Sequence, residues 1–196
     1  MTVTELYNKL CDPGFKDPET GYLSFMAYMY LYSPQNEYQV RNEINNLKDR
    51  LIRPNTLVDV LVLNIFDVFC DYLKSQNFGN QDYFSFLLKR EETTPDNVHR
   101  TLTNKAREDS FFKYLHLQIQ DHIQTPGDFA KVYIFLHGFG QIYPYLRVSM
   151  FLSQFEQYIS GYKLIMFYPG THDINYKLFS VLDDKNPYRA IKLINQ

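Results

Sequence analysis

The stretch Val58–Gln76, VDVLVLNIFDVFCDYLKSQ, decides the fold because it joins a strand pattern directly to a helix pattern. Val58–Ile65 carries β-branched residues and leucine on both faces, which predicts a strand buried on both sides. From Phe66 to about Gln76 the sequence predicts a helix. Alternation of strands and helices is typical of a parallel or mixed sheet covered by helices.

A second strand and helix are predicted just before this stretch. Tyr22–Tyr32 is dense in Tyr, Met, Leu and Phe, which favours a buried strand, although periodicity alone also allows a helix. Ser33-Pro34 suits the start of a helix, because Ser accepts hydrogen bonds from free amides and Pro fits the first helical position. The helix itself is indicated by one apolar stripe at helical spacing, formed by Val40, Ile44, Leu47 and Leu51.

The remainder of the chain resumes the alternation after a long interruption. Residues 83–123 mostly keep helical spacing, with a helix start at Thr94-Pro95, and predict a helical insertion or a long crossover. Val132–Leu136 and Lys163–Tyr168 are predicted strands, the second of them ended by a Pro169-Gly170 turn. A helix is expected to begin at Pro144. The last two segments, Tyr176–Leu182 and Tyr188–Ile194, predict a hairpin at the sheet edge.

Length and composition favour one domain over residues 1–196. The chain has 196 residues, 45% hydrophobic and 17% aromatic, which is enough apolar surface for one core. The expected fold is α/β, with a mixed, mainly parallel sheet flanked by helices. It divides into a strand–helix–strand–helix half (22–76), a helical insertion (83–123) and a C-terminal half that carries the motifs (130–196). A short amphipathic stretch around Leu6 and Leu10 is expected to be a docking arm in front of this domain.

The net charge indicates which class of partner the chain binds, and the cysteine content indicates its cellular compartment. The formal net charge of -2 makes nucleic acid unlikely as the main partner. Two cysteines, Cys11 and Cys70, are too few for a disulfide framework, and no leader pattern is present, so the cytoplasm is expected. The apolar runs fall short of the roughly 20 residues that cross a bilayer, so no membrane contact is predicted.

Motif spacing argues against the common classes of enzyme. No pair of the eight glycines has the spacing of a phosphate-binding P-loop or of an esterase nucleophile elbow. The dinucleotide-binding pattern fails because Tyr143 stands where its third glycine is needed. No two histidines are spaced as i and i+4 for one metal ion, Cys70 suits a core residue, and His137 is most simply a structural residue. The sequence therefore predicts no catalytic residue, no cofactor and no metal.

The segment Gly138–Arg147 leaves two interpretations open. A glycine-bearing turn between a strand and a helix exposes amides that can hold an anion, so the chain could be a nucleotide- or phosphate-binding enzyme using Gly138–Tyr143. The favoured alternative is a tight turn, because phosphate-binding turns normally carry a Lys or more glycines. Arg147 is expected one turn inside the following helix, where it needs a carboxylate partner. Asp183 or Asp184 could pair with Arg147 or with Arg189.

Three blocks in order resemble the BrxB family. The first runs from Gly138 to Arg147 and contains a glycine pair, Tyr-Pro and Leu-Arg; the second is a Pro-Gly pair; the third is the ending from Leu178 to Ala190. The first half agrees more loosely, and His137, Thr171–Ile174 and Pro187 depart from the family pattern. The residues that the resemblance marks as motif or possible binding residues are Gly138, Gly140, Tyr143, Pro144, Arg147, Pro169, Gly170, Asp183, Asp184, Tyr188 and Arg189.

The resemblance implies a function in bacterial antiviral defence. BrxB proteins are small accessory components of BREX (bacteriophage-exclusion) systems and are not known as enzymes. Membership would make this chain a non-catalytic accessory or scaffold subunit that gives phage resistance by protein–protein binding. The partners it implies are other BREX proteins, first the PglZ-like phosphatase-fold protein, then the methyltransferase or the ATPase.

Overall fold

A computed structural model describes residues 2–16, 27–54, 56–124, 131–172, 176–179, 181–183 and 191–192. The described strands are β1 Ala27–Tyr32, β2 Val58–Asn64, β3 Asn77–Phe78, β4 Gln81–Asp82, β5 Lys131–His137, β6 Lys163–His172, β7 Tyr176–Leu178, β8 Leu182–Asp183 and β9 Ile191–Lys192. The described α-helices are α1 Val3–Cys11, α2 Pro13–Lys16, α3 Glu37–Leu51, α4 Ile65–Lys74, α5 Tyr83–Glu91, α6 Pro95–Lys105, α7 Asp109–Gln124, α8 Phe139–Ile142 and α9 Val148–Phe155. Short 3-10 turns cover Pro34–Asn36 and Glu156–Tyr158.

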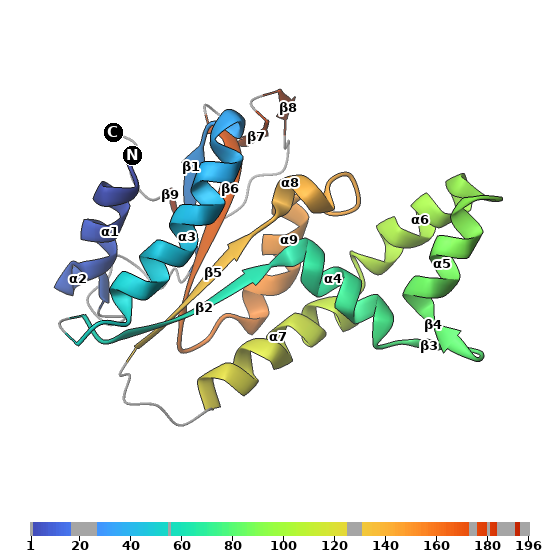
Figure 1. Ribbon diagram of the computed structural model, residues 1–196, viewed down its shortest axis with the longest axis horizontal. Coiled ribbons are helices and arrows are strands. Elements are labelled where there is room, and N and C mark those ends of the chain that lie inside the picture. The colour runs from blue at the N-terminus through green and yellow to red at the C-terminus, as the bar shows by residue number, and fades with distance from the viewer. Residues whose placement is uncertain are drawn as a thin grey trace.

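The central sheet has the strand order β2-β5-β6-β1-β9, and each of these neighbours pairs in parallel. Within the described part of this sheet, antiparallel pairing occurs at the far end of β6, where β7 joins it and β8 joins β7; the separate β3–β4 pair is also antiparallel. Helices lie on both sides of this sheet (Figure 1). The fold is therefore the mixed, mainly parallel α/β architecture that the alternation of strands and helices predicts.

One face of the sheet is covered by α1, α2 and α3. The apolar stripe of α3 is buried, as its spacing predicts. It packs against every second residue of the strands, the ones whose side chains point to this face of the sheet. Leu6 and Leu10 of α1 are 0% exposed in the same cluster, and the Tyr133 hydroxyl donates to the Leu10 carbonyl at 3.0 Å. The stretch around Leu6 and Leu10 thus packs against the body as part of the core.

The other face is covered by α4, α7, α8 and α9, which enclose the larger core cluster. Neighbouring residues of one strand divide between the two faces: Ile134 of β5 belongs to this cluster and Phe135 to the opposite one. Helix α4 begins where the Asn64 side chain accepts a hydrogen bond from the Phe66 amide at 3.0 Å. Residues 83–123 are helical, as predicted, and α5 and α6 extend away from the sheet with the β3–β4 hairpin (Figure 1).

Several boundaries differ from the expectations. The strand β2 lies at an edge of the sheet and is half-buried along most of its length, because an edge strand lacks a neighbour on one side. Strand β6 runs through Pro169-Gly170 to His172, so this pair does not end it. The final segments do not form one hairpin together: β7 pairs with β6, whereas β9 pairs in parallel with β1. Within the described residues, every helix is too short or too polar to cross a bilayer.

Candidate functional site

The Gly138 turn lies at the carboxyl edge of the parallel sheet. His137, the last residue of β5, is opposite Asn64, the last residue of β2, and Gly138 follows with a φ of 90°. A Cβ on Gly138 would lie 2.0 Å from the Asn64 Oδ1, so only glycine fits both the backbone and the space. The Asn64 Nδ2 donates to the Gln141 Oε1 at 2.8 Å. The turn thus closes around the side chain that also caps α4.

At Gly140 the missing side chain lets an aromatic ring approach the backbone closely. A Cβ on Gly140 would lie 2.8 Å from the Phe179 ring and 3.4 Å from Pro169, so the missing side chain makes room for that ring. Phe179 has a φ of 53°, a left-handed conformation that is rare for a bulky residue. Its amide donates to the Pro169 carbonyl at 2.8 Å. Two separated motif positions, Gly140 and Pro169, therefore hold one aromatic residue in place.

Gly170 marks the point at which β6 changes partners. Tyr32 of β1 is opposite Pro169 in parallel register, and the next residue, Gly170, is opposite Leu178 of β7 in antiparallel register. A Cβ on Gly170 would lie 2.0 Å from the Lys177 carbonyl oxygen. The Pro-Gly pair is thus a switch point within a strand, which explains why its turn-like composition misleads a prediction from sequence.

Tyr143, Pro144 and Arg147 lie between two helices instead of inside one. Helix α8 ends at Ile142, a cis peptide bond joins Tyr143 to Pro144, and α9 begins only at Val148 with Arg147 as its N-cap residue. The expectations that Pro144 begins a helix and that Arg147 lies one turn inside it are wrong. Tyr143 and Arg147 help line a mostly apolar cavity of about 10 Å³. That volume holds about one water molecule, far less than the hundreds of Å³ of a nucleotide pocket.

His137 is the main titratable group of this edge. Its Nδ1 is buried and has no hydrogen-bond partner among the residues that the structure describes. Burial first, and the Arg41 charge second, lower the pKa of His137 below its usual 6.5. The Tyr32 hydroxyl donates to Glu37, and Glu37 pairs with Arg41 at 2.8 Å, so these three side chains satisfy one another. A neutral histidine next to a closed ion pair suits a structural residue.

Cys70 also has the properties of an inert residue. Its side chain on α4 is half-buried, and burial raises the pKa of the thiol, which disfavours the reactive thiolate. Across the described ranges, no three His, Cys, Asp or Glu side chains are placed to hold a metal ion.

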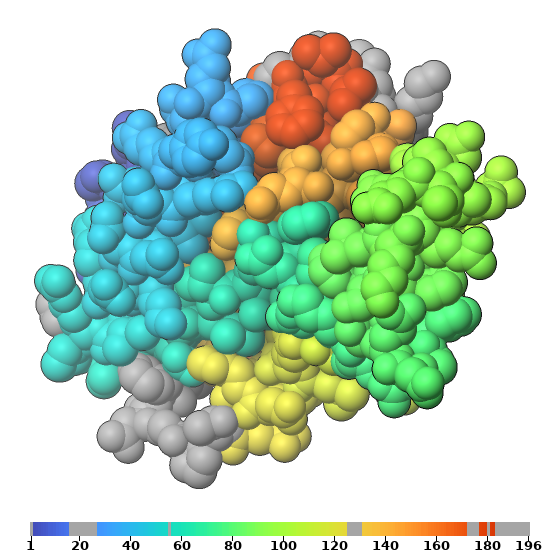
Figure 2. Space-filling model, turned by 45° about the vertical axis from the view of Figure 1, so that its right-hand side comes forward, coloured from blue at the N-terminus to red at the C-terminus, as the bar shows by residue number. Residues whose placement is uncertain are grey.

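The motif packing presents an exposed apolar corner, which we call the hairpin surface and define as Phe179 and Val181. Val181 is 76% exposed, and Phe179 is also exposed although its ring contacts Gly140. In Figure 2 the red-coloured end of β6 and its hairpin lie between the blue start of α3 and the orange α8. Phe179 lies within the third block of the resemblance, but neither Phe179 nor Val181 was named as a candidate site residue. A glycine inside a strand, here Gly170, was the available signal, since it often marks the close approach of another backbone.

The remaining predicted site residues are only partly described. Asp183 ends β8, and its backbone pairs with Lys177. Asp184, Tyr188 and Arg189 lie outside the described residues, so the expected pairing of Asp183 or Asp184 with Arg147 or Arg189 stays a prediction. The structure places Gly138 against the Asn64 side chain, Gly140 against Pro169 and the Phe179 ring, and Gly170 against the Lys177 backbone.

Comparison with known proteins gives the family. The family model described as "BREX protein BrxB" matches residues 61–193. A BREX protein BrxB of Bacillus cereus (strain H3081.97) is 25% identical over 193 residues, 98% of this chain and 95% of that protein. One of Escherichia coli O9:H4 (strain HS) is 25% identical over 169 residues, 85% of this chain and 77% of that protein. No solved structure gives a significant match. This chain belongs to the BrxB family of BREX proteins.

Proposed function

We propose that this chain is a non-catalytic accessory subunit of a BREX-type phage-defence assembly in the bacterial cytoplasm, and that it acts by binding another BREX protein through the hairpin surface. Family membership supports the part that concerns BREX defence. The PglZ-like phosphatase-fold protein is the first partner we propose, with the methyltransferase or the ATPase as the others.

The packing role of the motif glycines supports this proposal. Gly140 and Gly170 are at positions where a side chain would collide with Phe179 or with the β7 backbone. The absence of a side chain at Gly140 and Gly170 leaves room for Phe179 and for β7. Phe179 and Val181 therefore stay at the molecular surface, with Phe179 in a costly left-handed conformation. Exposed aromatic and apolar side chains on a preorganised support are typical of protein-binding surfaces.

The chemistry of the Gly138–Arg147 segment supports binding over catalysis. The cavity beside Tyr143 and Arg147 has room for about one water molecule. Two residues with catalytic potential, His137 at the end of β5 and Cys70 on α4, have pKa values that burial shifts toward their neutral forms. Among the described residues, the neutral Cys70 thiol and the buried His137 imidazole lack the arrangement of an activated nucleophile and its base.

Binding to purified partners tests this proposal. The tagged chain is titrated against the PglZ-like protein, the methyltransferase and the ATPase from the same defence locus. We expect one of them to bind, and Val181→Asp to weaken that complex by about tenfold or more, because a charge would be buried in an apolar contact. Val181 is exposed, so this variant should fold like the native chain.

The matched control is Leu117→Asp, which puts the same charge on an exposed leucine of α7. It should leave binding unchanged. Failure of the native chain to bind any of the three proteins, together with normal phage resistance after deletion of its gene, would refute the proposal. Equal losses of binding affinity in Val181→Asp and Leu117→Asp would show that the hairpin surface is not the binding site.

A further inference from the structure

A second exposed surface lies on the arm, which we define as residues 77–107, from the β3–β4 hairpin through α5 and α6. The arm leaves the body after α4 and returns at α7, where the Tyr72 hydroxyl and the Ser110 hydroxyl lie 2.6 Å apart. Figure 1 shows it projecting from the end of the molecule opposite to α1 and both termini. Its outer side is therefore accessible to another molecule.

Three aromatic rings stack on the arm. The rings of Phe78 and Phe86 have centroids 4.0 Å apart and an interplanar angle of 28°, and Tyr83 stacks on Phe86 at 5.9 Å and 21°. Phe78 nevertheless remains 46% exposed, at the hairpin next to Gly79. A large ring that is held by stacking and still open to solvent is preorganised for a contact.

Two cations border these rings. The Arg90 guanidinium lies 5.5 Å from the centre of the Phe86 ring, and the Lys89 ammonium donates to the neutral Gln81 side chain at 2.7 Å. Both side chains are exposed, and neither forms an ion pair with a carboxylate of the described residues. Lys105 differs, because it lies over Tyr83 but pairs with Glu108 at 2.9 Å. Lys89 and Arg90 are thus available to an external carboxylate.

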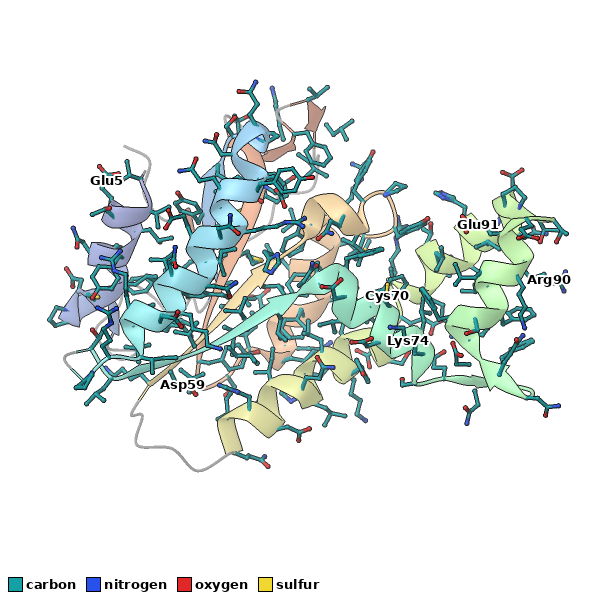
Figure 3. All side chains as sticks on the ribbon, in the orientation of Figure 1. Glu5, Asp59, Cys70, Lys74, Arg90 and Glu91 are labelled. Carbon is teal, nitrogen blue, oxygen red and sulfur yellow. The ribbon has the colours of Figure 1, made fainter. Side chains whose placement is uncertain are left out.

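The charges nearby favour a protein over a nucleic acid. Glu91 and Glu92 follow Arg90 directly in the chain, so carboxylates adjoin the cations of this helix end in sequence. Figure 3 shows Arg90 at the outer edge of α5, whereas Glu91 lies on the side toward α6. Nucleic acid requires a continuous basic surface that neutralises successive phosphates. A phenylalanine and an arginine side by side, with a lysine at the rim, are instead typical of the centre of a protein interface.

We propose that Phe78, Lys89 and Arg90 form a second docking surface, for a protein that offers an apolar pocket for Phe78 with carboxylates at its rim. This contact is separate from the hairpin surface and goes beyond the proposed function. A chain that uses both surfaces joins two proteins of the assembly.

Charge reversal on the arm tests this inference with the full-length chain. The double variant Lys89→Glu/Arg90→Glu is titrated against the same three purified BREX proteins and against single-stranded oligothymidylate. We expect the affinity for one of the proteins to fall by about tenfold or more, since two attractive pairs become repulsive. Phe78→Ala should weaken the same complex. Leu88→Asp is the matched control, because Leu88 is exposed on the same helix but about 160° away from Arg90.

The outcomes separate this inference from the proposed function. If the arm variant Lys89→Glu/Arg90→Glu no longer binds one of the proteins and Val181→Asp still binds that protein, the second surface is supported. Unchanged binding of all three proteins in the double variant, while Val181→Asp still loses its partner, overturns the arm surface and leaves the proposed function standing. The arm surface is also overturned if the native chain binds the oligonucleotide, the double variant does not, and the affinities for the three proteins are unchanged.

Discussion

Gly170 has a structural role that a single methyl group can test. In Gly170→Ala the added Cβ would come 2.0 Å from the Lys177 carbonyl oxygen, and this atom belongs to backbone that cannot simply rotate away. We expect a loss of about 1–3 kcal/mol in the free energy of unfolding, the usual cost of overpacking. The β6–β7 pairing should loosen locally, seen as faster hydrogen exchange of the Phe179 amide, which donates to Pro169 at 2.8 Å.

Gly161→Ala is the control for that variant. Gly161 has a φ of 78° with nothing within 4 Å of an added Cβ, so alanine there costs only backbone strain, about 1 kcal/mol. Exchange of the Phe179 amide should stay at the native rate in this control. Native-like exchange of the same amide in Gly170→Ala would show that β7 tolerates the methyl group and that Gly170 does not place the hairpin.

His137 should make stability depend on pH in a defined direction. Burial and the Arg41 charge lower the pKa of His137 in the folded chain, whereas the unfolded chain keeps the ordinary 6.5. Below pH 6.5 the unfolded state therefore binds more protons, and the free energy of unfolding falls as the pH decreases toward the folded-state pKa. In His137→Gln this contribution is absent, so the variant should lose less stability than the native chain between about pH 7 and about pH 5.5. An imidazole titration by NMR with a midpoint at or above 6.5 for His137 would contradict the assignment.

At the scale of elements, the sequence predicts best where the hydrophobic period is long and regular. The α3 stripe of Val40, Ile44, Leu47 and Leu51 is fully buried, and α6 begins at Pro95 as expected. These predictions depend on local geometry alone, since helical spacing and a first-turn proline specify a face and a boundary without any distant contact.

Elements whose form depends on a distant partner were predicted less well. Pro169-Gly170 has the composition of a turn, yet the strand continues because β1 and β7 supply successive partners. The hairpin surface escaped prediction for the same reason, since Phe179 reaches Gly140 only after β6 and β7 pair. The β3–β4 hairpin was not predicted, although Gly79-Asn80 between two short runs is a hairpin pattern; it lies between the helix expected to end at about Gln76 and the helical insertion expected from residue 83.

At the scale of the whole molecule, the strand order was beyond the reach of the sequence. β1 and β2 are consecutive in the central sheet along the chain, but β5 and β6 lie between them. The helix α3 accordingly covers one face while the helices between β2 and β6 cover the other. Alternation of strands and helices indicates both layers but does not say which strand lies next to which, because every buried strand carries the same apolar pattern.

The shared sheet should make the whole chain unfold as one unit. Ile134 and Phe135 are neighbours on β5 but belong to the two core clusters, so neither face can lose its packing while the strand stays in place. Ile44→Val on α3 and Ile119→Val on α7 remove the same methylene from opposite faces, each at about 0.5–1.5 kcal/mol. In urea, both variants should shift one single transition, with circular dichroism and tyrosine fluorescence coincident. Two transitions, each moved by only one of the variants, would show instead that the layers are separate folding units, because a methylene lost from one face would then leave the other face at its native stability.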